Sequence, residues 1–504
     1  MKKLIMFFLL SSSTLLFSQT KDYNITEFGA KPDTISNNAL FIQNAIDTAS
    51  AKGGGRVIVP SGVFMTGCIK LKAGVNLFLE TSAVLLGSDD RKDYGGYPAV
   101  PLVSADNADN VSITGLGTID GNGHELIKDI FQKLREGTLD DPDWKIKRPI
   151  EFNRPRLVSF NNCTNVIVKG VTIKNGTGWI QLYDNCTDLT IDGIRVESTT
   201  YWNNDGIDVT NSKNVKITNC FVNAADDGIC FKSEGEQPGM CENFYVADCT
   251  IRSSASAIKF GTASHGGFKN FTIKNINIYD TYRSAIALEC VDGGIMDSID
   301  IRNITAKNTG NALFIRLGKR NKEGGYSQIS NIHIAQVTVE VPKDKPDASY
   351  PLDGPPVTTP HNTFPVSIVG LPGHPVKNVT LETIRIVYPG GADKKVAYIP
   401  LDSLANVPEK AEQYPEFSMF GELPCWGIYV RHAEGIKMDN VRLSYKEYDF
   451  RPACVFDDVD GLDLFGINVL TGKDIPVILL NNVRKYSLIS IKLPVDYDKG
   501  IKIQ

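Results

Sequence analysis

A short unit recurs along most of this 504-residue chain and constrains its fold more than any other feature. Each copy has asparagine or another small residue followed by alternating apolar residues, as in Asn165-Val-Ile-Val and Asn214-Val-Lys-Ile. The copies that begin at residues 165, 188, 214, 243, 270 and 298 are separated by 23, 26, 29, 27 and 28 residues. Short alternating segments rich in β-branched residues, with Gly, Asn and Asp between them, predict strands joined by turns.

A period of roughly 20–30 residues without helical segments is typical of a solenoid, in which each coil completes the core of the next. We therefore predict an all-β fold, a right-handed parallel β-helix with three short strands in each coil. Asparagine tolerates left-handed backbone, so we expect the repeated asparagines to occupy turns and to form a ladder along the stack. Weaker copies at Gly435, Gly461 and Tyr486 continue the pattern towards the C-terminus.

The ends and the interruptions of the repeat predict the remaining architecture. Between residues 37 and 52, Ile42, Ala45, Ile46 and Ala49 have helical spacing, so we expect a short helix that covers the first coil. Insertions at about 123–154, 342–365 and 390–424 interrupt the repeat, and the first contains a predicted helix from 125 to 135. We expect these insertions to form walls over one face of a single β-helix domain that spans residues 19–504.

The first eighteen residues have the pattern of an export signal. Lys2 and Lys3 precede an apolar run from 4 to 17 with Ser18 as a possible cleavage point, so we expect a periplasmic or secreted protein. No later stretch reaches the roughly 18 apolar residues that a span requires, and we predict no membrane anchor. A net charge of -5 argues against a nucleic-acid partner, and we expect a monomer.

The ten cysteines allow two interpretations. In an exported chain they can form a disulfide framework. However, Cys163 and Cys186 are 23 residues apart and Cys220 and Cys249 are 29 apart, which matches the local repeat. This spacing favours reduced cysteines stacked in the core, where a free thiol packs like a small apolar group.

Two acidic clusters are one repeat apart. They are Asn203-Asn204-Asp205-Gly206-Ile207-Asp208-Val209 and Asp226-Asp227-Gly228-Ile229-Cys230-Phe231-Lys232. Alignment on Asp-Gly-Ile places Asp205 over Asp227 and crowds Asp205, Asp226 and Asp227 into one patch. Neighbouring carboxylates raise one another's pKa, which lets one remain protonated beside an ionised one and indicates hydrolytic acid–base chemistry. The alternative is that these aspartates only cap turns.

Further motifs connect the chain to a known family. They are Phe28-Gly-Ala-Lys-Pro-Asp, Gly53-Gly-Gly-Arg-Val-Ile-Val-Pro-Ser-Gly, Gly115-Leu-Gly-Thr-Ile-Asp-Gly-Asn-Gly and Arg154-Pro-Arg-Leu-Val-Ser-Phe. With the acidic clusters, they resemble the bacterial branch of glycoside hydrolase family 28, the polygalacturonase and rhamnogalacturonan hydrolase family. The resemblance covers residues 23–340 well and the remainder more loosely. It implies an exported, inverting hydrolase of a pectic glycan, with Asp226 as general acid and Asp205 and Asp227 activating water.

Two motifs of that family are altered here. The family's Gly-His-Gly falls near Ser254–Ser256, which contains no histidine, and His265 is either its replacement or a surface residue. The family's Arg-Ile-Lys, which grips a substrate carboxylate, falls at Ala287-Leu288-Glu289. The resemblance therefore implies a galacturonosidase or rhamnogalacturonan-type specificity. The substrate-binding candidates are Asn203, Lys232, Lys259, His265, Arg283, Glu289 and Arg316, with Arg320 as a further nearby cation.

Several alternatives remain open from the sequence. Arg316 aligns with Glu289, so these two residues are candidates for an ion pair. A calcium-dependent pectic polysaccharide lyase would use the aspartates as metal ligands. A non-catalytic glycan-binding β-helix would use neither chemistry. No His/Cys cluster has metal-ligand spacing and no cofactor motif is present, so we predict neither metal nor cofactor. The run that begins at Tyr414 and the pair Arg431-His432 resemble the bacterial branch and are candidates for the far wall of the cleft.

Overall fold

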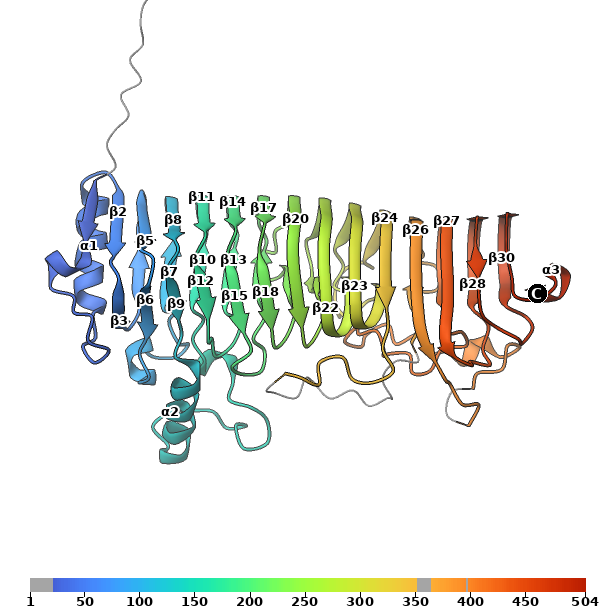
Figure 1. Ribbon diagram of the computed structural model, residues 1–504, viewed down its shortest axis with the longest axis horizontal. Helices are drawn as coiled ribbons and strands as arrows, with labels where there is room; N and C mark the ends of the chain where they lie inside the picture. Colours follow the sequence, from blue (N-terminus) through green and yellow to red (C-terminus); the bar gives the residue numbers. More distant parts are fainter. Residues whose placement is uncertain (1–20, 351–363, 396–397) are drawn as a thin grey trace, which may run out of the picture.

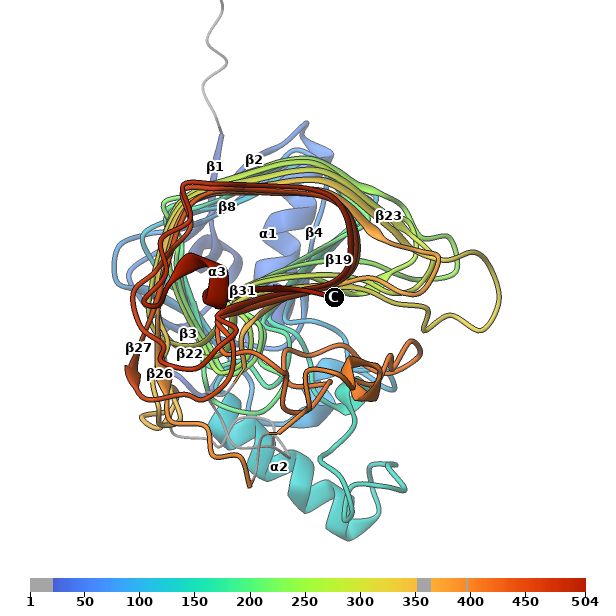
Figure 2. The same ribbon diagram turned by 90° about the vertical axis from the view of Figure 1, so that its right-hand side faces the viewer.

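The computed structural model describes residues 21–350, 364–395 and 398–504. Their strands stack in parallel from one end of the molecule to the other (Figure 1). Viewed along the stack, the coils enclose a common core (Figure 2). The parallel β-helix is therefore confirmed. The predicted export signal and the central part of the predicted insertion at 342–365 lie outside the described residues.

The strands form three faces, named here in chain order within a coil. The first face contains β1 (Asp22–Asn24), β2 (Gly55–Val59), β5 (Val75–Leu79), β8 (Asp109–Gly115), β11 (Thr164–Lys169), β14 (Thr187–Asp192) and β17 (Lys213–Thr218). The second face contains β3 (Gly62–Thr66), β6 (Ala83–Gly87), β9 (Thr118–Asp120), β12 (Thr172–Lys174), β15 (Arg195–Ser198) and β18 (Phe221–Ala224). The third face contains β4 (Ile69–Leu71), β7 (Val103–Asp106), β10 (Val158–Asn161), β13 (Gln181–Asp184), β16 (Ile207–Thr210), β19 (Ile229–Ser233), β21 (Ile258–Ser264), β25 (Val366–Val369) and β31 (Ile501–Ile503).

In the later coils a strand continues through a bend and takes part in more than one face. These strands are β20 (Cys241–Ser253), β22 (Gly267–Cys290), β23 (Ile295–Leu317), β24 (Gln328–Glu340), β26 (Val376–Gly390), β27 (Ile428–Glu447), β28 (Cys454–Phe465) and β30 (Ile478–Ile489). The short β29 (Asn468–Val469) pairs with the last part of β27.

The repeated asparagines form the expected ladder at the start of the first face. Asn214, Asn243 and Asn270 have left-handed backbone, with φ of 55°, 62° and 59°. The Asn243 side-chain amide donates to Asn214 Oδ1 at 3.1 Å, and the Asn270 amide donates to Asn243 Oδ1 at 2.7 Å. Each asparagine therefore satisfies a turn and joins two coils, which confirms the predicted register of the repeat.

The core is continuous and apolar. Phe244 and Phe271, at matching positions of neighbouring coils, stack with ring centroids 4.3 Å apart. Cys163 and Cys186 are likewise buried on neighbouring coils. All ten cysteines lie within the described residues and all are free thiols, so the disulfide framework is wrong and the stacked arrangement is confirmed.

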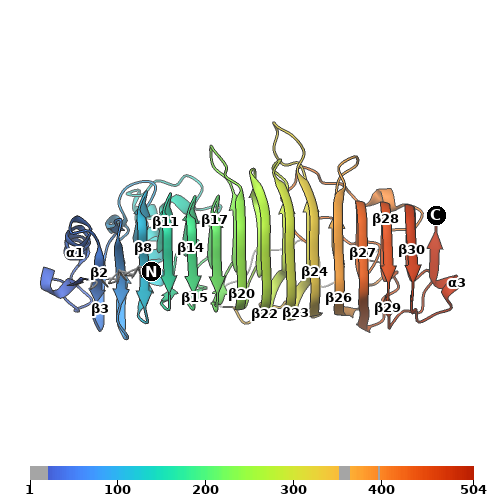
Figure 3. The ribbon, with the colours of Figure 1, turned by 90° about the horizontal axis from the view of Figure 1, so that it is seen from above.

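Helices cover the ends and one side of the stack. α1 (Ala39–Ala51) covers the first coil with the four apolar residues predicted for this role, and α3 (Tyr497–Gly500) lies at the opposite end (Figure 3). α2 (Gly123–Glu136) confirms the predicted helix of the first insertion. Short 3-10 helices are η1 (Ile25–Phe28), η2 (Arg91–Tyr94), η3 (Glu151–Asn153) and η4 (Leu404–Asn406).

The first and third insertions project from the same side of the stack, as Figures 1 and 2 both show. This is the side on which the second face turns into the third. Within the described ranges, no helix combines the length and apolarity needed to cross a membrane.

Candidate active site

The three predicted catalytic aspartates lie in successive turns from the second face to the third. Asp205 lies between β15 and β16, and Asp226 and Asp227 lie between β18 and β19. Ile207 pairs with Ile229, which confirms the offset of one coil inferred from the Asp-Gly-Ile motif.

The glycine of each motif is required by the close approach of the coils. A Cβ on Gly228 would lie 2.5 Å from Ile251 Cγ2 and 2.7 Å from the carbonyl oxygen of Ala257. A Cβ on Gly206 would lie 2.6 Å from the carbonyl oxygen of Gly228. Only glycine fits here, and it places each preceding aspartate directly over the next coil.

A cavity of about 400 Å³ opens at these turns. All three aspartates line it, together with Asn203, Lys232, Arg283 and Arg320. Arg148 from the first insertion and Tyr414 from the third also line it, so both insertions form walls as predicted. The cavity combines carboxylates with several fixed cations, which suits a polar ligand.

Lys232 neutralises one side of the carboxylate centre. Its Nζ lies 3.2 Å from Asp205 Oδ2, contacts Asp208 Oδ1 more closely, and lies 3.9 Å from the ring centroid of Trp179. Asp205 Oδ1 is buried and has no hydrogen-bond partner among the described residues. One oxygen of Asp205 is thus held by an ammonium group, and the other is buried beside the cavity without a partner among the described residues.

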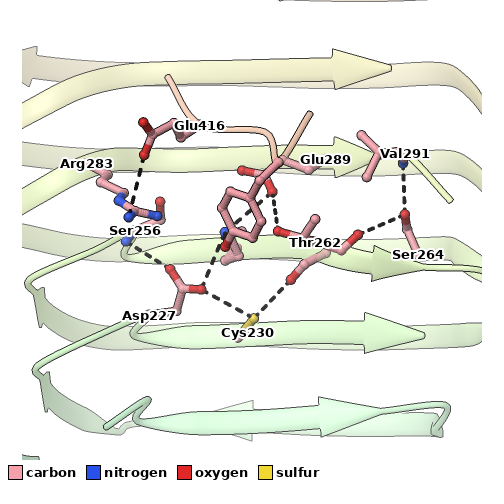
Figure 4. A network of polar contacts seen from close by, with 12 residues as sticks. Asp227, Cys230, Ser256, Thr262, Ser264, Arg283, Glu289, Val291 and Glu416 are labelled. Atoms are coloured by element: carbon pink, nitrogen blue, oxygen red, sulfur yellow. Dashed lines mark hydrogen bonds and ion pairs between the residues drawn. The ribbon is translucent and has the colours of Figure 1, made fainter. Parts of the chain in front are cut away.

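Lys259 neutralises the other side. Its Nζ lies 3.5 Å from Asp227 Oδ2 and 3.4 Å from Glu289 Oε2. Figure 4 shows this network, in which the backbone N–H of Ser256 donates to Asp227 Oδ1 at 3.1 Å and Thr262 donates to Glu289 at 3.1 Å. Each carboxylate is therefore held by more than one group.

The electrostatic environment separates the three aspartates. Burial and the neighbouring Asp227 carboxylate raise the pKa of Asp226. Burial and Asp208 raise the pKa of Asp205 well above its usual value. Burial acts on Asp227 in the same direction, but the charges of Lys259 and other nearby cations outweigh it and lower its pKa. The centre thus places a carboxyl whose pKa is raised beside one whose pKa is lowered, which is the kind of separation that acid–base catalysis uses.

The structure distributes the predicted substrate-binding residues between the cavity and its surroundings. Asn203 lines the cavity and accepts a hydrogen bond from Arg154 Nη2 at 3.3 Å. Arg283 lines it with its guanidinium 3.6 Å from Glu416 of the third insertion. Lys259 and Glu289 lie behind the wall, 1% and 2% exposed.

Two predicted residues are not brought to the cavity. His265 is exposed, its Nδ1 lies 3.2 Å from the carbonyl oxygen of Ser233, and it is not among the residues that line the cavity. Arg316 is buried and donates to the carbonyl oxygens of Gly370 and Glu409 instead. These positions give neither residue a contact with the three aspartates.

The ion pair between Glu289 and Arg316 is wrong, although the alignment behind it is confirmed. The two residues are paired in register on β22 and β23. The Glu289 carboxylate nevertheless contacts Lys259 and Thr262, while the Arg316 guanidinium packs 5.1 Å from the Phe420 ring. The strand register places the two backbones side by side, but each side chain contacts other groups that lie near it.

Sequence reasoning missed the roles of Asp208 and Ser256. Asp208 is fully buried on β16 and pairs with Lys232, and an acid in the middle of a core strand was the available signal. The Ser256 contribution is a backbone N–H and carries no signal in residue type.

The donor atoms of the centre do not suit a metal ion. Ligand atoms of Asp205, Asp227 and Cys230 lie within 4.8 Å of one another. However, ammonium groups lie 3.2 and 3.5 Å from the two carboxylates, and burial raises the pKa of the Cys230 thiol well above its usual value. Calcium requires about six to eight oxygen ligands, so this donor set does not fit it.

A parallel β-helix in which adjacent carboxyl groups with oppositely shifted pKa values line a lateral cavity defines a class of protein equipped for general acid–base chemistry. The sequence profile of glycosyl hydrolases family 28 matches residues 50–406, and the chain belongs to this family.

Individual relatives agree with this assignment. The chain is 26% identical over 336 residues to an exo-poly-α-D-galacturonosidase of Dickeya chrysanthemi, an alignment that covers 57% of this chain and 55% of that protein. It is 24% identical over 286 residues to an endo-polygalacturonase of Pectobacterium carotovorum subsp. carotovorum, covering 52% and 67%. The chain thus spans about half the length of the first of these relatives.

The fold is shared with solved structures. An exopolygalacturonase from Thermotoga maritima superimposes with a TM-score of 0.61 at 23% identity, covering 84% of this chain and 92% of that one. A family 28 exopolygalacturonase from Yersinia enterocolitica superimposes with a TM-score of 0.55 at 18% identity, covering 94% and 78%. At these identities the comparison supports the β-helix architecture.

Proposed function

We propose that the protein is an inverting, exo-acting glycoside hydrolase that releases an acidic sugar from a pectic glycan through a galacturonosidase or rhamnogalacturonan-type linkage. The observation that carries this proposal is the carboxylate centre, in which Asp226 and Asp227 have oppositely shifted pKa values inside a cavity lined by cations. The names of the family 28 relatives, which act on galacturonans, support the substrate class.

The proposed reaction uses the three aspartates in two roles. Asp226 gives its proton to the glycosidic oxygen as the bond to the anomeric carbon breaks. Asp227 takes a proton from water, and the water oxygen attacks the anomeric carbon from the opposite face, which inverts its configuration. Oxygens of Asp205 and Asp227 lie within 4.8 Å of each other, a separation that suits two groups sharing one water.

The cavity cations support an acidic sugar. Arg283 and Arg320 provide planar guanidinium groups that can bind a carboxylate with two hydrogen bonds. Arg320 already donates two hydrogen bonds to Asp292, at 2.9 and 2.8 Å, whereas Glu416 lies 3.6 Å from the Arg283 guanidinium, so Arg283 is the better candidate for the substrate carboxylate. The walls contributed by residues 123–154 and 390–424 support action at a chain end.

The two alternatives are less well supported. The calcium-dependent lyase requires a calcium site, but the carboxyl groups that would bind the ion already lie against the ammonium groups of Lys232 and Lys259. The non-catalytic glycan-binding protein does not require carboxyl groups with opposite pKa shifts, and burying these charges costs stability without a catalytic use.

The test compares the wild-type protein with Asp226→Asn on a panel of pectic oligosaccharides, followed by proton NMR with a chelator present. We expect release of a sugar with inverted anomeric configuration, lost in Asp226→Asn. Asp248→Asn is the matched control, because Asp248 occupies a left-handed turn that suits Asn and lies outside the cavity. Unsaturated products would establish the lyase, and binding without any product would establish the glycan-binding protein.

The N-terminal sequence supports export to the periplasm or the medium, and the same proposal includes a monomer. The mass of the protein recovered from the periplasm tests removal of residues 1–18, and light scattering tests the monomer. A retained N-terminus or a dimer mass would contradict these two points.

A further inference from the structure

Lys259 occupies an unusual position beneath the carboxylate centre. It is 1% exposed, it is not among the residues that line the cavity, and its Nζ lies between Asp227 and Glu289 at 3.5 and 3.4 Å. It therefore acts on the cavity from behind the residues that line it, through contacts to Asp227 and Tyr414.

A buried ammonium group is stable only when its charge is compensated. Asp227 faces the ammonium group from the turn before β19, and Glu289 faces it from the end of β22, where burial raises the pKa of Glu289 to about 7 although the Lys259 charge opposes this. Glu289 is itself fixed by the Thr262 hydroxyl at 3.1 Å, and the Tyr414 hydroxyl lies 3.5 Å from Lys259 Nζ. Contacts from three sides hold the lysine in one place.

The other charges that face Asp227 have nearer partners of their own. Lys232 on β19 lies closest to Asp208 and Asp205, and Arg283 on β22 pairs with Glu416. The carboxyl of Asp226 adjoins in the same turn, and the Cys230 thiol lies 3.9 Å away. Within the described part of the chain, one cation lies within ion-pair distance of the Asp227 carboxylate, and it is Lys259.

We propose that Lys259 and Glu289 are positioning residues rather than sugar contacts: Lys259 fixes Asp227 as the ionised base, and Glu289 holds Lys259 against it. The proposal rests on the proposed function for the role of Asp227. It reassigns two residues that sequence reasoning treated as contacts to substrate.

The direction of the effect follows from the charges. Among the groups that lower the pKa of Asp227, against the opposing effect of burial, Lys259 is the strongest. Because a base must be ionised, activity is lost as the pH falls through the pKa of Asp227. Removing Lys259 raises this pKa and moves the acid limb of the pH profile upward. Burial raises the pKa of Glu289 to about 7, so this group is already neutral at the acid limb, and replacing it by Gln should leave the limb near its wild-type position.

The first experiment measures kcat/KM against pH for wild type, Lys259→Met, Lys259→Arg and Glu289→Gln. We expect the acid limb to move up by about 1–3 pH units in Lys259→Met, as for loss of an opposite charge within a few ångströms. Lys259→Arg keeps the charge and should restore the limb to near its wild-type position. Lys133→Met is the matched control, since Lys133 also bridges two carboxylates, Asp90 and Asp129, away from the site.

A second readout does not depend on turnover. Carbon-13 NMR titration of the Asp227 carboxyl, assigned with Asp227→Asn, should show the same upward shift in folded Lys259→Met. An unmoved Asp227 titration in a folded variant would overturn the inference, even if the enzyme is active. An upward shift in a protein that hydrolyses no substrate would support the inference about Lys259 and defeat the proposed function.

Discussion

The close approach of coils at Gly228 gives a prediction whose size can be worked from the structure. In Gly228→Ala the new Cβ would lie 2.5 Å from Ile251 Cγ2 and 2.7 Å from the Ala257 carbonyl oxygen, whereas ordinary contacts begin at 3.4 Å. The coils must separate by several tenths of an ångström. The Ala257 carbonyl also accepts the backbone hydrogen bond of Ile229 at 2.9 Å, so the separation strains a bond that joins the two coils.

Two costs add to give the expected magnitude. Overpacking a tight core position costs about 1–3 kcal/mol, and weakening the hydrogen bond costs about 1 kcal/mol more. Local opening of the coils should therefore become about 2–4 kcal/mol easier, which corresponds to amide exchange faster by roughly 30-fold to several hundred-fold.

The assay is hydrogen–deuterium exchange followed by mass spectrometry on peptides that cover residues 226–260. Gly325→Ala is the matched control, because a Cβ there meets nothing within 4 Å and the backbone is not left-handed. Its exchange should equal that of wild type. If Gly228→Ala also exchanges like wild type across this segment, the reasoning that glycine is required for coil contact is refuted.

Two further predictions concern the ligand and the ladder. Replacing Arg283 by Met should raise KM for an acidic oligosaccharide by about 10- to 100-fold, because a hydrogen bond to a charged group contributes about 1.5–3 kcal/mol. The same change should alter KM little for the methyl-esterified substrate. Equal effects on both substrates would contradict carboxylate binding. Asn243 has φ of 62°, a left-handed conformation that is unfavourable for Ala but not for Gly. In denaturant titrations, Asn243→Ala should therefore have a free energy of unfolding about 1 kcal/mol lower than that of Asn243→Gly. The reverse order would contradict this explanation.

Much of the architecture was predictable because a solenoid converts sequence spacing into spatial neighbourhood. The alignment of Asp205 with Asp227 required only the interval between two motifs, and the pairing of Ile207 with Ile229 confirms it. The same logic placed the stacked cysteines and the asparagine ladder. Regular pairing of this kind leaves few alternatives for residues within the strands.

The surroundings of the aspartates were less predictable, for two physical reasons. The strands are irregular beside the site, with register shifts between Phe231 and Ser233 and between Thr281 and Ser284, and such shifts break the alternation used to assign side-chain direction. In addition, Tyr414 reaches Lys259 from 155 residues away along an insertion outside the repeat. Neither the register shifts nor the contact between Tyr414 and Lys259 follows from the period of the sequence.

The two buried lysines give the carboxyl groups of the centre different surroundings. Lys232 contacts Asp205 and Asp208. Lys259 contacts Asp227 and Glu289, so each buried ammonium group lies against two carboxyl groups. Asp226, although it lines the cavity, forms no ion pair in the described part of the chain.

Asp226 thus lines the cavity without an ammonium contact in the described part of the chain, and burial and the adjoining Asp227 raise its pKa. Burial also raises the pKa of Asp205 and of Glu289 despite their lysine contacts, so Asp227 is the member of the three aspartates whose pKa is lowered. This arrangement suits the role of general acid proposed for Asp226, because the proton of such an acid must remain in place until the leaving oxygen accepts it. A lysine closer to Asp226 would lower its pKa and oppose that role. The stacking of the coils therefore determines the chemistry through the placement of two lysines as much as through the three aspartates.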